Sequence, residues 1–206
     1  MPGIYTGSYT VQPGDPLISG RLKITLRDNN GRTVSRETSS RFTLLSKPLT
    51  AVTYDNLGYL TYGTTGDRLG PVKMGYLDSA VALCVTGKIN GYYKVKLSEN
   101  HTAYITDVNV DILKDSSFTP LSPVISIKTG SDKKFDYVAM GLDKRLPYCS
   151  YQQPDSAQLV IDVFGAISSK SWMASLQNLR EIKSIRFIQA EKDVFRCVLI
   201  LQHAQC

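Results

Sequence analysis

The chain has 206 residues, of which 42% are hydrophobic and 20% are charged, with a formal net charge of +6. This length accommodates one to three small domains with buried cores. No continuous apolar run of about 18 residues occurs, which excludes a membrane-spanning helix. The N-terminus lacks the basic and apolar segments of a signal peptide. The basic balance permits an anionic partner, although a lysine excess is more often simply a soluble surface.

Short strands are predicted throughout residues 1–47. The pattern of alternating apolar and polar residues is typical of strands, and it covers residues 4–11, 21–26, 33–38 and 41–45. The sequence Asp-Asn-Asn-Gly at 28–31 is typical of a tight turn. Residues 46–50, which contain Pro48, are interpreted as a linker.

The same pattern continues through residues 57–113. Strands are predicted at 81–85, 92–97, 102–105 and 108–113, with a turn that contains two glycines at 87–91. Alternation along 92–97 places Tyr93, Val95 and Leu97 on one face, which we take as the core side. Tyr92, Lys94 and Lys96 then face outward.

Residues 114–123 are rich in Ser and Pro and are predicted to be a second linker. Beyond it, strands are expected at 124–128, 137–142, 158–164, 182–189 and 194–201. One short helix is expected after Ser171, whose hydroxyl is a good N-cap. Trp172, Leu176 and Leu179 follow at helical spacing.

Five stretches resemble parts of three modules of periplasmic N-acetylmuramoyl-L-alanine amidases. PGIYTGSYTV resembles the last half of a bacterial immunoglobulin-like sandwich, and GYYKVKLSENHTAYITDVNV with DRLGPVKMGYLD resembles a bacterial SH3-like barrel. LVIDVFGA and KSIRFIQAEKDVFRCVLIL resemble the two most recognisable stretches of an AMIN domain, a fold built from two similar β-halves. The resemblance implies a mainly β chain with three parts: a partial Ig-like segment at 1–47, an SH3-like barrel at 51–113 and an AMIN-like β-sandwich at 124–206.

Both ends of this arrangement leave open questions. A full immunoglobulin-like sandwich needs roughly 100 residues and seven strands, so residues 1–47 form either an incomplete domain or an independent meander packed on the barrel. In the AMIN-like domain, 136–149 aligns with 193–206 as a weak repeat. The second copy then lacks a counterpart of 158–164, so we expect a C-terminal truncation that leaves 194–201 with an unpaired edge or a less covered core.

Catalytic and metal-binding patterns are not found in the sequence. His101 and His203 fall in different predicted domains, without acidic neighbours at metal-ligand spacing, whereas catalytic zinc typically has three protein ligands. Asp162 is interpreted as a sheet-surface residue and not as a general base. We therefore expect no catalytic residue, metal or cofactor in this chain.

The cysteines suggest no redox or zinc motif either, since Cys-x-x-Cys spacing does not occur. Cys84 and Cys197 lie in apolar strand runs and are expected to be buried thiols. A bridge between Cys149 and Cys197 remains open for an oxidising compartment, because the sequence does not fix its geometry.

Tyrosines and lysines are the better candidates for a binding site. We name Tyr62, Tyr92, Lys94, Lys96 and Tyr104 as candidate ligand-binding residues. An outward tyrosine can stack on a sugar ring or a peptide while a neighbouring lysine contacts a carboxylate. The alternative is that these tyrosines cover a neighbouring domain.

The resemblance implies a non-catalytic module, located in the periplasm or cell envelope, that binds peptidoglycan and places a downstream amidase catalytic domain. Another class of function is a structural scaffold that spaces a catalytic domain without binding the wall. A nucleic-acid-binding small barrel is suggested by charge alone and is not expected, because the interleaved aromatic and basic residues are too few.

Overall fold

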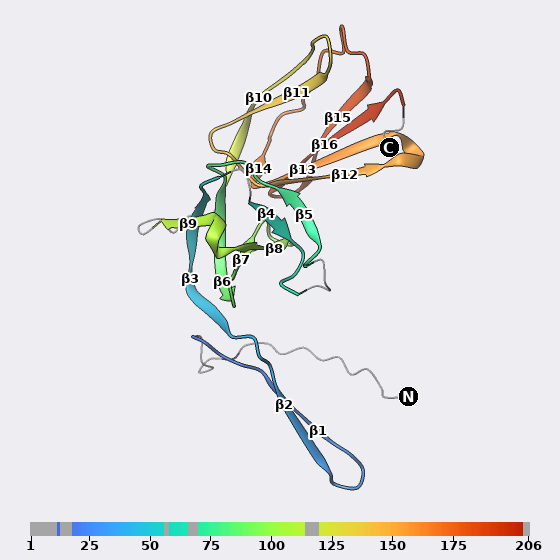
Figure 1. Ribbon diagram of the computed structural model, residues 1–206. Helices are drawn as coiled ribbons and strands as arrows, with labels where there is room; N and C mark the ends of the chain where they lie inside the picture. Colours follow the sequence, from blue (N-terminus) through green and yellow to red (C-terminus); the bar gives the residue numbers. More distant parts are fainter. Residues whose placement is uncertain (1–11, 13–17, 56–57, 66–69, 114–119, 204–206) are drawn as a thin grey trace.

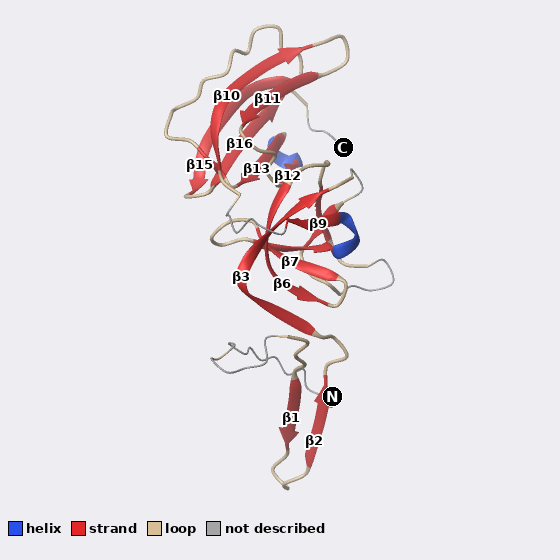
Figure 2. Ribbon diagram, turned by 90° about the vertical axis from the view of Figure 1, so that its left-hand side faces the viewer, coloured by secondary structure: helices blue, strands red, loops and turns tan. Residues whose placement is uncertain are grey.

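The computed structural model describes residues 12, 18–55, 58–65, 70–113 and 120–203. They confirm the predicted mainly β class, since the described residues form sixteen strands and no α-helix. The two helical turns among them are the 3-10 turns η1 (Asp107–Asn109) and η2 (Pro154–Ser156). Figures 1 and 2 show a hairpin, a middle sheet and a C-terminal sandwich in sequence order.

An isolated hairpin projects away from the rest of the chain (Figures 1 and 2). Strands β1 (Lys23–Arg27) and β2 (Thr33–Glu37) pair antiparallel, and every residue in them is exposed. The predicted tight turn is confirmed, because the Asp28 carboxylate accepts the backbone N–H groups of Asn30 and Arg32. The predicted strand at 4–11 lies outside the described residues.

The linker predicted at 46–50 is wrong, because β3 runs without interruption from Phe42 to Thr53. Its pairing with β6 is irregular between Leu44 and Leu49. Pro48 has no N–H to donate, so it is accommodated in this irregularity and does not end the strand. The hairpin is therefore joined to the middle sheet through a continuous strand.

The middle unit is one bent sheet. Its seven strands follow the order β5-β4-β8-β7-β6-β3-β9. Besides β3 they are β4 (Tyr59–Thr61), β5 (Lys73–Tyr76), β6 (Ala82–Ile89), β7 (Tyr92–Lys96), β8 (Thr102–Thr106) and β9 (Val110–Leu113). In the described part of the chain β5 and β9 are edge strands, so the sheet is open, whereas the SH3-like resemblance led us to expect a barrel.

The core of this sheet agrees with the predicted alternation. Val95 and Leu97 are buried and Tyr93 packs against them, as expected for the inward face of β7. Ile105 of β8 is fully buried in the same cluster and pairs with Tyr93. Tyr92, Lys94 and Lys96 consequently lie on the opposite face.

The C-terminal unit is a sandwich of two sheets. The first has the order β11-β10-β14 and the second β12-β13-β16-β15. Their strands are β10 (Ser122–Ser131), β11 (Asp136–Leu142), β12 (Tyr148–Gln153), β13 (Gln158–Phe164), β14 (Ala166–Ile167), β15 (Ile182–Glu191) and β16 (Val194–Leu201). Apolar residues of both sheets share one core, as Val124 of β10 and Phe195 of β16 illustrate.

The helix predicted after Ser171 is not formed. Residues 168–181 instead cross from β14 to β15 as an irregular segment. Trp172 packs on the sandwich core and donates its indole N–H to Ser168 at 2.7 Å, while Leu179 packs on a second apolar cluster. A helix of about ten residues is marginal in water, and these separate anchors favour an irregular crossing.

The unpaired edge expected at 194–201 is also wrong. Strand β16 lies inside its sheet, with β13 on one side and β15 on the other. The strand at 194–201 was predicted correctly, but the weak repeat did not indicate which strands flank it. The edges of this sheet are β12 and β15.

The middle sheet and the sandwich share a hydrophobic core. Phe164 at the end of β13 and Val194 at the start of β16 are buried in the same cluster as Leu60, Val95 and other residues of the middle sheet. The Phe164 ring also lies 5.3 Å from the His101 ring, measured between centroids. This shared burial joins the two units.

Phe164→Ala should leave a cavity in this shared core. We expect the free energy of unfolding to fall by about 3–5 kcal/mol, measured by urea denaturation. The control is Phe135→Ala, since Phe135 is 68% exposed and its loss should change stability by less than about 0.5 kcal/mol. A similarly small effect at Phe164 would contradict the shared core.

The Asp136 carboxylate of β11 holds the irregular segment 168–181 against the β11-β10-β14 sheet through hydrogen bonds. Asp136 Oδ2 accepts the backbone N–H groups of Arg180, Glu181 and Ile182 at 2.9, 2.7 and 3.0 Å. Together with a bond from Ser131, these donors lower the pKa of Asp136 from 3.8 to about 2. Because the folded pKa is depressed, the ionised form stabilises the fold.

This contribution should be present above about pH 4 and lost as the pH falls towards about 2. Asp136→Asn should lower the melting temperature at pH 7 and flatten its dependence on pH between about 4 and 2, measured by thermal denaturation. Asp143→Asn, at an exposed aspartate in the β11–β12 loop, is the control. If the melting temperatures of Asp136→Asn and the unmodified chain fall equally between about pH 4 and 2, the proposed role of Asp136 is wrong.

Candidate functional site

Four of the five predicted binding residues lie on one face of the middle sheet. Tyr92, Lys94 and Lys96 alternate along β7, and Tyr104 of β8 pairs directly with Lys94. Directly paired residues on neighbouring strands project to the same side, with Cβ atoms about 5 Å apart. The β-ladder therefore gathers Tyr92, Lys94, Lys96 and Tyr104 into one surface, which we call the Tyr–Lys face.

The Tyr–Lys face is accessible and carries uncompensated positive charge. Lys96 is exposed, and Tyr92, Lys94 and Tyr104 are partly exposed. Neither Lys94 nor Lys96 forms an ion pair within the described residues. Lys88 of β6 differs, because its ammonium lies 2.7 Å from the Asp107 carboxylate, whose hydrogen bond raises the lysine pKa.

The fifth predicted residue, Tyr62, lies next to β4 and not on β7 or β8. It directly follows β4, whose Thr61 pairs with Tyr104, and its side chain is 62% exposed. Tyr62 therefore does not form part of the β7–β8 ladder.

The sequence analysis did not identify a second group of aromatic side chains, which surrounds Lys73. The Lys73 ammonium lies 4.6 Å from the Tyr59 ring centroid and 5.1 Å from that of Tyr76, and it donates to the Tyr76 hydroxyl at 2.9 Å. That hydrogen bond raises the pKa of Lys73. The sequence did not indicate this group, because Tyr59 and Tyr76 become partners only through the register of β4 and β5.

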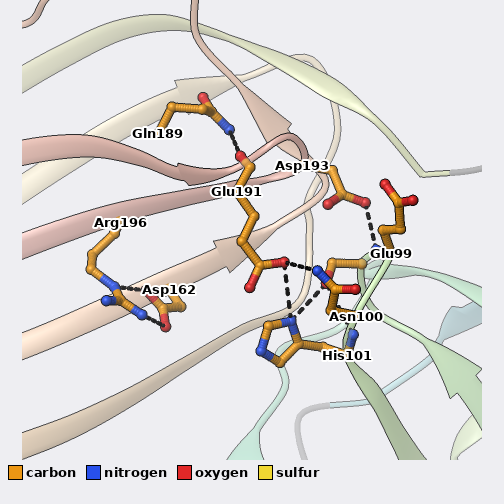
Figure 3. Close-up of polar contacts among 9 residues, drawn as sticks. Glu99, Asn100, His101, Asp162, Gln189, Glu191, Asp193 and Arg196 are labelled. Carbon is orange, nitrogen blue, oxygen red and sulfur yellow. Dashed lines mark hydrogen bonds and ion pairs between the residues drawn. The ribbon is translucent and has the colours of Figure 1, made fainter.

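The two histidines both have acidic partners that sequence spacing did not reveal. His101 Nδ1 lies 3.7 Å from Glu191 Oε2, and His203 Nδ1 lies 3.1 Å from Glu181 Oε2. The His101 contact joins the β7–β8 loop to the β15–β16 turn (Figure 3). The partners lie far away in sequence, so only the tertiary fold brings them together.

The His101 group does not have the geometry of a catalytic triad. The Ser98 hydroxyl lies 2.7 Å from His101 Nδ1, the same ring nitrogen that faces Glu191. A triad places the serine and the acid on opposite ring nitrogens. Ser98 is also buried and accepts the His101 backbone N–H, so these bonds hold the loop at the junction.

Asp162 was wrongly interpreted as a sheet-surface residue, because it is buried with 7% exposure. Its carboxylate accepts two bonds from Arg196 of the paired strand, at 2.6 and 2.8 Å (Figure 3). The bidentate pair raises the pKa of Arg196 and satisfies the buried charge of Asp162. The sequence could not show that Arg196 lies in register.

Cys84, Cys149 and Cys197 are free thiols. A Cys149–Cys197 bridge does not fit this fold. Cys149 pairs with Asp162 whereas Cys197 pairs with Ile161, and consecutive residues of β13 face opposite sides of the sheet. The two sulfur atoms are therefore separated by the sheet itself.

Burial raises the pKa of Cys197 to about 12, so its reactive thiolate should be scarce at neutral pH. We expect native Cys197 to remain unmodified by iodoacetamide at about pH 8 and to react fully after denaturation, as determined by peptide mass spectrometry. Rapid labelling in the native state, or a Cys149–Cys197 disulfide in a non-reducing digest, would contradict this arrangement.

Within the described residues, no group of three or more His, Cys, Asp or Glu side chains is arranged to hold a metal ion. In the same part of the chain, no helix is long and apolar enough to cross a membrane. Comparison with protein-family models, curated proteins and solved structures finds no match. The functional argument therefore depends on the surfaces of this fold.

Proposed function

We propose that this chain is a non-catalytic, wall-binding part of a cell-envelope N-acetylmuramoyl-L-alanine amidase. In this proposal it binds peptidoglycan and positions a downstream catalytic domain. The observation that carries the proposal is the Tyr–Lys face, where Lys94 pairs directly with Tyr104 and is flanked along β7 by Tyr92 and Lys96. The resemblance of the sequence to amidase modules supplies the class of ligand.

The chemistry of the Tyr–Lys face suits a polymer of sugars and peptides. A tyrosine ring offers a flat apolar surface for a sugar ring and a hydroxyl for hydrogen bonding. Lysine ammonium groups attract the carboxylates of wall peptides. Since the side chains project from paired strands, the backbone that carries them is already ordered before binding.

Binding at one such face should be weak and strengthened by repetition. The polymer presents many equivalent units, and linkage of modules in one chain raises the effective concentration at each further contact. A module of this kind retains an enzyme at the wall while permitting movement along it.

A structural scaffold is the second candidate. The observation that favours it is the shared core, where Phe164 and Val194 pack into the middle sheet. Such a core can hold a catalytic domain at a fixed distance without any contact with the wall. The two candidates differ in whether the Tyr–Lys face binds a ligand.

Sedimentation with purified peptidoglycan tests the proposal. We expect the chain to pellet with insoluble sacculi, and less so at high salt, because surface attraction is screened over about 8 Å near physiological ionic strength. A triple variant with Tyr92→Ala, Lys94→Ser and Lys96→Ser should pellet several-fold less while retaining its thermal stability.

The matched control carries Tyr137→Ala, Lys133→Ser and Lys134→Ser, which makes the same chemical changes at exposed positions on the β10–β11 hairpin. It should pellet like the unmodified chain. Equal loss in both triple variants would indicate a general charge effect. No pelleting of the unmodified chain would favour the scaffold.

A further inference from the structure

A cleft of about 550 Å³ lies where the middle sheet meets the sandwich. One wall is the β5–β6 loop, with Asp78, Ser79 and Val81, and the other comes from β11, the β11–β12 loop and the first residue of β12. Its volume falls within the range of about 300–1,000 Å³ typical of small-ligand sites. The Tyr–Lys face does not contribute to it.

The floor of the cleft is apolar. Val81, Leu146 and Val163 line it with exposures of 3%, 4% and 8%, and they belong to the buried cores of the two units. Met140 and Leu142 add partly exposed apolar surface. A ligand that fills this cleft should therefore carry an apolar group.

Two side chains of opposite charge line the cleft. Arg145 and Asp78 are both exposed, and neither forms an ion pair with the other or with any other described residue. Each is available to a ligand group of opposite charge.

Arg145 is already positioned. One terminal nitrogen of its guanidinium donates to the Ser79 carbonyl at 3.0 Å, and its own carbonyl accepts the Ala82 N–H at 3.1 Å. The Nε–H and the other terminal nitrogen donate to no described residue. These two groups form a fork that matches a carboxylate.

We propose that this cleft binds a short peptide with a free C-terminal carboxylate. The carboxylate pairs with Arg145, the ammonium of the peptide approaches Asp78, and an apolar side chain lies on the floor beside Val81 and Leu146. This inference goes beyond the wall-binding proposal and does not depend on it, because it uses different residues.

Three dipeptide probes separate the contributions. They are Leu-Ala, its C-terminal amide, which lacks the carboxylate, and its N-acetyl form, which lacks the ammonium. A ligand of about fourteen non-hydrogen atoms is expected to bind with Kd ~1 mM. The readout is the chemical shift of backbone amides in the full chain, above all those of Ser79, Val81, Leu142 and Leu146.

On the unmodified chain, Leu-Ala should shift these amides and bind about tenfold more tightly than its amide, as expected for a charge-assisted pair. Arg145→Gln should remove the preference for Leu-Ala over the amide, and Asp78→Asn should remove the preference over the N-acetyl form. Arg32→Gln, at an exposed position on the distant hairpin turn, is the control and should change neither preference.

The amide spectrum of each variant also reports whether the fold is intact. Because Arg145 contributes to the junction, Asp78→Asn provides a second variant that leaves the Arg145 bonds in place. The proposal is overturned if Leu-Ala shifts no cleft amides at millimolar concentration. It is equally overturned if both preferences survive in the two variants.

Discussion

Phe164 and Val194 come from the sandwich, yet both side chains are buried in the core of the middle sheet. Burying side chains of this size contributes about 1.5–3 kcal/mol each, which is large beside the roughly 5–15 kcal/mol that stabilises a typical domain. The surrounding polar contacts then fix how the sandwich is oriented against the middle sheet. Glu99 N–H donates to Asp193 at 2.9 Å, and Asn100 donates to Glu191 at 3.1 Å (Figure 3).

The surfaces that we consider functional depend on this junction in different ways. The Tyr–Lys face belongs to the middle sheet alone, but the junction fixes its direction relative to the sandwich. The cleft exists only because the two units meet, since Asp78 and Arg145 come from opposite walls. The junction thus gives one chain two separate surfaces of different chemistry, one aromatic and basic and the other a cleft with an apolar floor.

Local patterns allowed much of the fold to be predicted. Apolar patterns identified 158–164 and 194–201 with the same bounds as β13 and β16, and alternation correctly separated the two faces of β7. It failed where distant contacts decide the outcome. Pro48 suggested a linker but lies within β3, and Ser171 suggested a helix cap but belongs to an irregular crossing. Strand β12, which has mostly exposed residues, was not expected at all.

Only part of the candidate site could be predicted, for the same reasons. Tyr92, Lys94 and Lys96 share a face through alternation within one strand, whereas the pairing of Lys94 with Tyr104 required the register of two strands. The Asp162–Arg196 pair, the His101–Glu191 contact and the cleft all join segments far apart in sequence.

The most direct test of the shared core is the alignment of the two units in solution, measured by residual dipolar couplings. We predict that one alignment tensor fits the amides of both the middle sheet and the sandwich. Two different tensors would show independent movement and contradict the shared core.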